Sequence, residues 1–146
     1  MKEPKTEITN HTTSLEISKR LKELKLKQES LFYWDYCEAN DSGGYREWLD
    51  VVYISDVVDI DDTVASSYLA SELGEMAMSS INGTPLELLK VFDLLLPYPL
   101  YAARYFDQSI FGKSDKSMSN AMAYLIINLI ENNIVNYEWK KRWLYE

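Results

Sequence analysis

The chain has 146 residues, of which 47% are hydrophobic and 13% aromatic, and its formal net charge at pH 7 is −8. This length suits a single domain, and the apolar content excludes an intrinsically disordered chain despite the charge. An acidic surface repels DNA and anionic lipid, so we expect neither a nucleic acid nor a membrane among the direct partners.

The N-terminal stretch is polar, contains Pro4 and shows no apolar period, which predicts a flexible arm at residues 1–12 before one domain at residues 13–146. His11, the single histidine, lies in this arm without nearby catalytic partners. Cys37 is the single cysteine, so the chain forms no internal disulfide. Because no secretory signal and no apolar run near ~20 residues is found, we expect a cytoplasmic protein.

A helix start is predicted at Thr13, whose hydroxyl can cap the first turn while Glu16 reaches back to the N–H of the cap. The basic residues that follow are interrupted by glutamates and indicate a solvated face with pairs such as Glu23 and Lys27. The opposite, apolar stripe is formed by Ile17, Leu21 and Leu24.

Two strands are predicted after this helix. The first is the aromatic run LFYWDYC after Ser30, and the second is WLDVVYI at residues 48–54. Between them, residues 38–47 contain turn formers, including Gly43 and Gly44. Two strands alone are marginal in water, so we expect the first helix to cover this hairpin.

The segment SDVVDIDDT, residues 55–63, concentrates four aspartates. Clustered carboxylates are ligands for Mg²⁺ or Ca²⁺, although the spacing lacks the glycine and terminal glutamate of an EF-hand loop. Alternatively, Asp61 and Asp62 cap the helix predicted to follow, and the segment is a solvated loop. The candidate binding residues are Asp56, Asp59, Asp61 and Asp62.

Three further helices are predicted. One runs from Thr63 to about Met78, and its Gly74 indicates close packing against a neighbour. A second helix, PLELLKVFDLLL at residues 85–96, has too many apolar residues for one stripe and is either buried on two sides or part of an interface. The third is a strongly apolar core helix from about Met118 to Asn132, with a cap among Ser114, Asp115 and Ser117. The aromatic segment between them leaves residues 99–106 open as helix or as a third strand.

The C-terminal segment NYEWKKRWLYE places Trp139 and Trp143 four residues apart, on one face of a helix. Two interpretations stay open. This segment either packs on the domain or is a detachable amphipathic element for a partner.

Three stretches, SLEISKRLKELKLKQESLFYW, ASELGEM and AMAYLIINLIENNIV, resemble a group of small hypothetical proteins of bacterial phages and mobile elements. The resemblance implies a shared fold and carries no activity or functional residue. The group's pattern has glycine at the position of Lys25, where a Cβ disfavours a left-handed helix end by about 1 kcal/mol.

No nucleotide-binding, zinc-protease, redox or hydrolase signature is present, and no catalytic residue or cofactor is predicted. The negative charge is concentrated in residues 35–115, whose net charge is −11. We therefore expect an α+β fold, with a small antiparallel sheet of two to three strands packed against three to four helices. The expected function is that of a non-enzymatic accessory protein that binds another, unknown protein. The alternatives are an acidic DNA-mimic decoy that uses the carboxylates between Asp35 and Asp115, and a divalent-metal-dependent enzyme that uses Asp56, Asp59 and Asp61.

Overall fold

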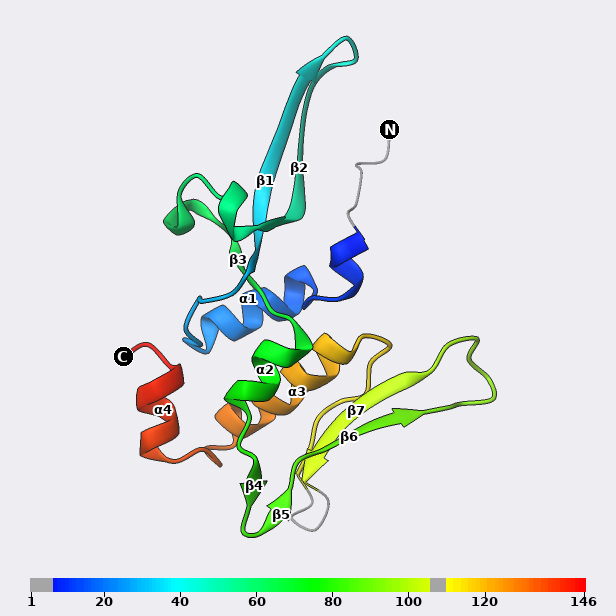
Figure 1. Cartoon of the computed structure of the whole chain (residues 1–146), viewed down its shortest axis with the longest axis vertical. Helices are drawn as coiled ribbons and strands as arrows, with labels where there is room; N and C mark the ends of the chain where they lie inside the picture. Colours follow the sequence, from blue (N-terminus) through cyan, green and yellow to red (C-terminus); the bar gives the residue numbers. More distant parts are fainter. Residues whose placement is uncertain (1–6, 106–109) are drawn as a thin grey trace.

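The computed structural model describes residues 7–105 and 110–146 (Figure 1). Within these residues the chain forms four α-helices and three small antiparallel sheets, which confirms the α+β class. The expectation of one sheet is wrong, because the strands divide into separate groups. The helices are α1 (Leu15–Glu23), α2 (Ala70–Met76), α3 (Met118–Glu131) and α4 (Tyr137–Trp143).

The first sheet has the order β2-β1-β3, with β1 (Phe32–Asp41), β2 (Gly44–Tyr53) and β3 (Ala65–Ser67). The second is the small hairpin of β4 (Ser80–Ile81) and β5 (Thr84–Pro85). The third has the order β6-β7-β8, with β6 (Glu87–Val91), β7 (Leu100–Tyr105) and β8 (Ile110–Phe111).

Helix α3 lies at the centre of the core, with α2 and β7 packed against it. Its fully buried side chains include Met122, Leu125, Ile126 and Leu129. Gly112, just after β8, approaches this helix so closely that a Cβ on it would lie 2.7 Å from the backbone nitrogen of Leu125. The predicted core helix is therefore confirmed. Ser117, one of the predicted caps, accepts the backbone N–H of Asn120.

Helix α1 begins one residue later than predicted, because Ser14 rather than Thr13 is its N-cap. Thr13 is instead fully buried, and its Oγ1 accepts the backbone N–H of Tyr68 at 3.0 Å. Lys25, the residue after the C-cap Leu24, adopts the left-handed region with φ of 68°, although a lysine there is strained. The predicted pair of Glu23 and Lys27 is replaced by an ion pair of Glu23 with Arg20 at 3.2 Å.

Residues 63–78 do not form the single helix that the sequence pattern predicts. The first part is β3, which pairs with β1 and fills its free edge at the foot of the hairpin. Only Ala70–Met76 are helical, and Glu72 accepts the N–H groups of Leu69 and Leu31. Asp61 and Asp62 therefore precede a strand and cap no α-helix. A Cβ added at Gly74 would meet no neighbouring atom within 4 Å, so this glycine marks no close packing.

Residues 85–96 are also not the helix that their composition predicts. Strand β6 pairs with β7 in an antiparallel register that places Glu87 opposite Arg104 and Val91 opposite Leu100. The carboxylate of Glu87 accepts the Arg104 Nε–H at 3.0 Å. This pairing answers the open question on residues 99–106, since 100–105 are a strand; residue 106 lies outside the described residues.

The hairpin of β1 and β2 is longer than predicted and projects from the rest of the molecule (Figure 1). Its strands run as far as Asp41 and from Gly44, so the predicted loop at residues 38–47 is mostly strand closed by a tight turn. Helix α1 packs against β3 instead of covering the hairpin. At the foot of the hairpin, Trp34 Nε1 donates to the carbonyl of Thr13, just before the helix, at 3.0 Å. The expected cover is therefore wrong for most of the hairpin's length.

Helix α4 packs on the domain, which decides between the two interpretations of the C-terminal segment. Trp139 is 7% exposed, and its Nε1 donates to the carbonyl of Met76 at 2.6 Å. The N-cap of the helix is Asn136, whose side chain accepts the N–H of Trp139.

Of the expected flexible arm, residues 1–6 lie outside the described residues. Glu7–Asn10 form the short 3-10 helix η1, and Thr12 is buried in a bridge to Leu69. Across the described part of the chain, we find no helix whose length and apolar character would let it cross a membrane.

Candidate functional site

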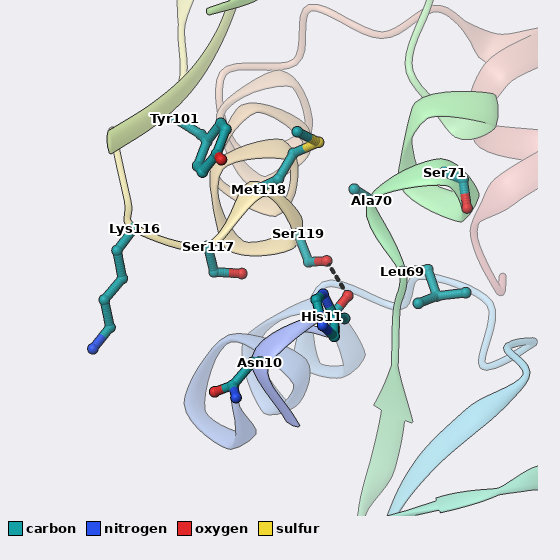
Figure 2. Close-up of a pocket in the computed structure, with 10 residues that line it drawn as sticks. All are labelled: Asn10, His11, Leu69, Ala70, Ser71, Tyr101, Lys116, Ser117, Met118 and Ser119. Carbon is teal, nitrogen blue, oxygen red and sulfur yellow. Dashed lines mark hydrogen bonds between the residues drawn. The ribbon is translucent and has the colours of Figure 1, made fainter. Parts of the chain in front are cut away.

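Three features of the described residues are candidates for function: a hollow at the start of α3, the acidic hairpin and an exposed apolar loop. The hollow has a volume of about 440 Å³ and lies between η1, the first turn of α2, β7 and the first turn of α3 (Figure 2). Asn10, His11, Tyr101 and Lys116 contribute to its wall.

Two of the hydroxyl groups in this hollow, those of Ser117 and Ser119, make hydrogen bonds that serve the fold. Ser119 Oγ donates to the backbone carbonyl of His11 at 2.5 Å, and Ser117 Oγ caps α3. Within the described residues neither hydroxyl has a basic side chain as hydrogen-bond partner, and Figure 2 shows Lys116 extending away from the other lining residues. The Lys116 ammonium lies 5.8 Å from the ring centre of Tyr98. The structure therefore shows neither Ser117 nor Ser119 as an activated nucleophile.

Cys37 lies in the middle of β1, opposite Trp48, and is half-buried. Burial, followed by the charges of Asp50 and Asp35, raises the pKa of its thiol. A raised pKa keeps the thiol protonated and unreactive at neutral pH. The thiol faces the backbone carbonyl of Asp35 at 3.9 Å, whereas His11 lines the hollow at the start of α3, so the structure does not pair the two as nucleophile and base.

The four candidate aspartates lie in two 3-10 turns, η2 (Ile54–Asp56) and η3 (Ile60–Asp62), and in the residues between them. All four are exposed, and Asp59 accepts the backbone N–H of Asp61 at 3.0 Å. In residues 7–105 and 110–146, no three His, Cys, Asp or Glu side chains gather closely enough to hold a metal ion. The structure thus supplies no geometry in favour of the metal-dependent alternative.

The net charge of the protein resides in the hairpin and these turns. Residues 32–62 contain nine of the 23 acidic residues and one of the 15 basic residues, so the remaining chain holds 14 of each. The hairpin and turns therefore carry a net charge of −8, equal to that of the whole chain, on a segment that projects from the body (Figure 1).

Two cross-strand pairs of this hairpin oppose like charges. Asp35 lies opposite Asp50, and Glu38 lies opposite Glu47. Like charges in directly opposite positions destabilise a ribbon. The hydroxyl of Tyr45 donates to Glu38 at 2.9 Å and lies 3.0 Å from Glu47. Hydrogen bonding to Glu38 and then to Glu47 raises the pKa of Tyr45 to about 12.

The third feature is an apolar loop, residues 92–98, at the end of the β6–β7 hairpin (Figure 1). Leu94 is fully exposed, Leu95 is 90% exposed and Phe92 is 73% exposed. Asp93 holds the turn, since its side chain accepts the N–H of Leu95 at 2.9 Å and its carbonyl accepts that of Leu96 at 3.0 Å. The backbone is thus ordered while the leucine side chains point into solvent.

Sequence reasoning predicts neither the exposed apolar loop nor the exposed side chains of the hairpin in their observed secondary structure. It assigns the loop leucines to a helix that is either buried or part of an interface. Of these two alternatives, only the interface agrees with the exposure of the leucines. It assigns Glu38, Tyr45 and Glu47 to a loop, whereas the strand register brings them together. The count of charge by segment already places the negative charge in residues 35–115, and a finer count narrows it to residues 32–62.

Comparison with protein-family models, with curated proteins and with solved structures finds no match to this chain.

Proposed function

We propose that this chain is a non-enzymatic protein-binding module and that its main contact surface is the apolar loop. The observation that carries the proposal is the full exposure of Leu94 together with the near-complete exposure of Leu95 and Phe92 on an ordered turn. Soluble domains seldom expose neighbouring large apolar side chains unless these contact a partner. Val91 and Tyr98, each 43% exposed, extend the same surface.

The strength expected of such a contact follows from the leucines. Burying a leucine side chain contributes about 1.5–3 kcal/mol. Replacing two leucines with serine therefore weakens an interface built on this loop by roughly 100-fold or more. An apolar contact also responds little to salt, because no separated charges are screened.

The test compares affinity capture from the native cell by the wild type and by Leu94→Ser/Leu95→Ser, at low and at high salt. Val58→Ser is the matched control, because Val58 is also fully exposed but lies between η2 and η3. A protein retained by the wild type and the control, resistant to salt and lost from the double variant, supports the proposal. Identical captured proteins for all three chains contradict it.

Lipid vesicles give the second arm of the test. If the wild type sediments with neutral or anionic vesicles and the double variant does not, the loop inserts into lipid and the protein-binding proposal is wrong.

A second candidate function is that of an acidic DNA-mimic decoy, and the observation that favours it is the location of the entire net charge on residues 32–62. A projecting anionic hairpin suits the basic groove of a nucleic-acid enzyme. Binding of this kind weakens steeply between low and physiological salt. A captured partner that resists salt contradicts the decoy function.

A further inference from the structure

The hairpin of β1 and β2 has one face whose chemistry goes beyond negative charge. Because side chains alternate along strands, the register of the pairing places Tyr36, Glu38, Tyr45 and Glu47 on the same side of the ribbon. We call these four residues the Tyr/Glu face. Tyr36 is 59% exposed and Tyr45 is 61% exposed, and both glutamates are exposed. Among the described residues, β3 pairs with β1 at the foot of the ribbon and the 3-10 helix η1 contacts β2, whereas the four side chains of the face lie nearer the turn.

We propose that the Tyr/Glu face is a docking site for an extended, arginine- or lysine-rich segment of a partner protein. This proposal is independent of the apolar loop, which lies on a different hairpin (Figure 1). It would give the protein a second binding surface with a partner of opposite charge.

Charge complementarity is the first argument. Glu38 and Glu47 face each other across the ribbon, and the nearest balancing group on that face is a neutral phenol, Tyr45. The basic residue of the ribbon, Arg46, serves the opposite side, where its Nη2 lies 2.9 Å from Asp41 and its guanidinium lies 5.7 Å from the ring centre of Trp48. A cation from outside therefore relieves a repulsion that the ribbon itself leaves in place.

The tyrosines supply the second argument. A guanidinium or ammonium group is attracted both to carboxylates and to the face of an aromatic ring. Alternating tyrosine and glutamate along β1 and β2 offers both contacts at once to a basic side chain. The aspartates of η2 and η3 offer charge alone, without such an alternation of rings.

The edge of the ribbon supplies the third argument. Among the described strands β2 is the end strand of the order β2-β1-β3, so its outer side is a sheet edge to which an extended segment can add a strand. At the foot of the same face lies a hollow of about 540 Å³. Its wall includes Leu15, Trp34 and Leu49 together with Glu16, which suits the aliphatic stem and charged end of a long basic side chain.

The experiment measures binding of a labelled octapeptide of alternating arginine and threonine by fluorescence anisotropy at low salt. A peptide with citrulline in place of arginine is the ligand control, because citrulline keeps the shape and loses the charge. The Glu38→Gln/Glu47→Gln variant removes two charges from the face. The matched control, Asp59→Asn/Asp61→Asn, removes two charges from the exposed turns and leaves the face intact.

We expect Glu38→Gln/Glu47→Gln to weaken binding by roughly 5- to 30-fold, from two exposed ion pairs, and the aspartate control to weaken it by less than about 2-fold. Tyr36→Ser changes no charge and should weaken binding by about 2- to 5-fold through the lost ring contact. The Leu94→Ser/Leu95→Ser variant should bind the peptide like the wild type. Backbone amide NMR spectra show that each variant is folded and should place the peptide-induced shifts on β1 and β2.

Equal losses in the glutamate and aspartate variants, with no effect of Tyr36→Ser, would show that charge alone attracts the peptide and would overturn the proposal. Binding of the citrulline peptide as tightly as the arginine peptide, or no binding of either, would also overturn it. None of these outcomes bears on the apolar loop, so the two proposals fail separately.

Discussion

Replacing Trp139 with alanine removes a buried indole through which α4 contacts the core. The substitution also leaves the carbonyl of Met76 without the N–H that it accepts at 2.6 Å. Truncating a buried tryptophan to alanine costs about 3–5 kcal/mol. In a domain of this size each kcal/mol lowers the melting temperature by roughly 2–4 °C, so we expect a decrease of about 6–20 °C.

Thermal unfolding followed by circular dichroism measures this decrease, and two variants of the same helix separate its causes. Trp139→Phe keeps an aromatic ring and loses the donor, so it should cost about 1–3 kcal/mol. Tyr137→Ala is the control for helix α4, because Tyr137 is 71% exposed, and it should stay within about 0.5 kcal/mol of the wild type. If Trp139→Ala melts within about 2 °C of the wild type, α4 is a detachable element and its assignment to the core is refuted.

Three further predictions concern the core and its pH dependence. Gly112→Ala should lower the free energy of unfolding measured in urea by about 1–3 kcal/mol, because the new Cβ would lie 2.7 Å from the Leu125 backbone nitrogen. An unchanged free energy of unfolding would mean that the chain after β8 does not approach α3 this closely. Ser117→Ala should cost about 1 kcal/mol in the same assay through loss of the α3 cap, and Ser117→Asp should restore most of it, whereas equal stability of all three chains would contradict the cap. Burial raises the pKa of Tyr105 from 10.0 to about 12. The folded state thus favours the neutral phenol, so this contribution to stability is complete below pH 10 and is lost as the pH rises to about 12. Tyr105→Phe should therefore reduce the fall in the free energy of unfolding that urea titrations measure across that pH range.

Local patterns predict the elements whose partners are close in sequence. Helix α3 is apolar on nearly every side, and its N-cap at Ser117 is a local hydrogen bond, so its position could be predicted from periodicity and cap chemistry. The two strands of the long hairpin are predictable for the same reason. Helix α1 is displaced by one residue from its predicted start, because Thr13 and Ser14 are equally suitable caps and a buried contact of Thr13 with Tyr68 selects Ser14.

Most of the candidate site could not be predicted from the sequence. Residues 85–96 have the composition of a buried helix, yet the pairing of Glu87–Val91 with β7 turns their first part into a strand and leaves Leu94 and Leu95 at a hairpin end. Periodicity cannot show this, since this strand pairing depends on residues that follow nine or more positions later. The Tyr/Glu face likewise depends on the register of two strands, which a shift of one residue would reverse.

The α+β class, the central apolar helix, the aromatic hairpin and the excess of carboxylates in the middle of the chain can all be read from the amino-acid sequence, because each follows from composition or from contacts between near neighbours. Three further features become visible in the folded chain alone: α4 packs on the core, the aspartates at residues 56–62 are spread over exposed turns, and the loop leucines and the Tyr/Glu face are turned outward. The physical reason is that exposure depends on what packs against a residue, and the packing partners here come from distant parts of the chain.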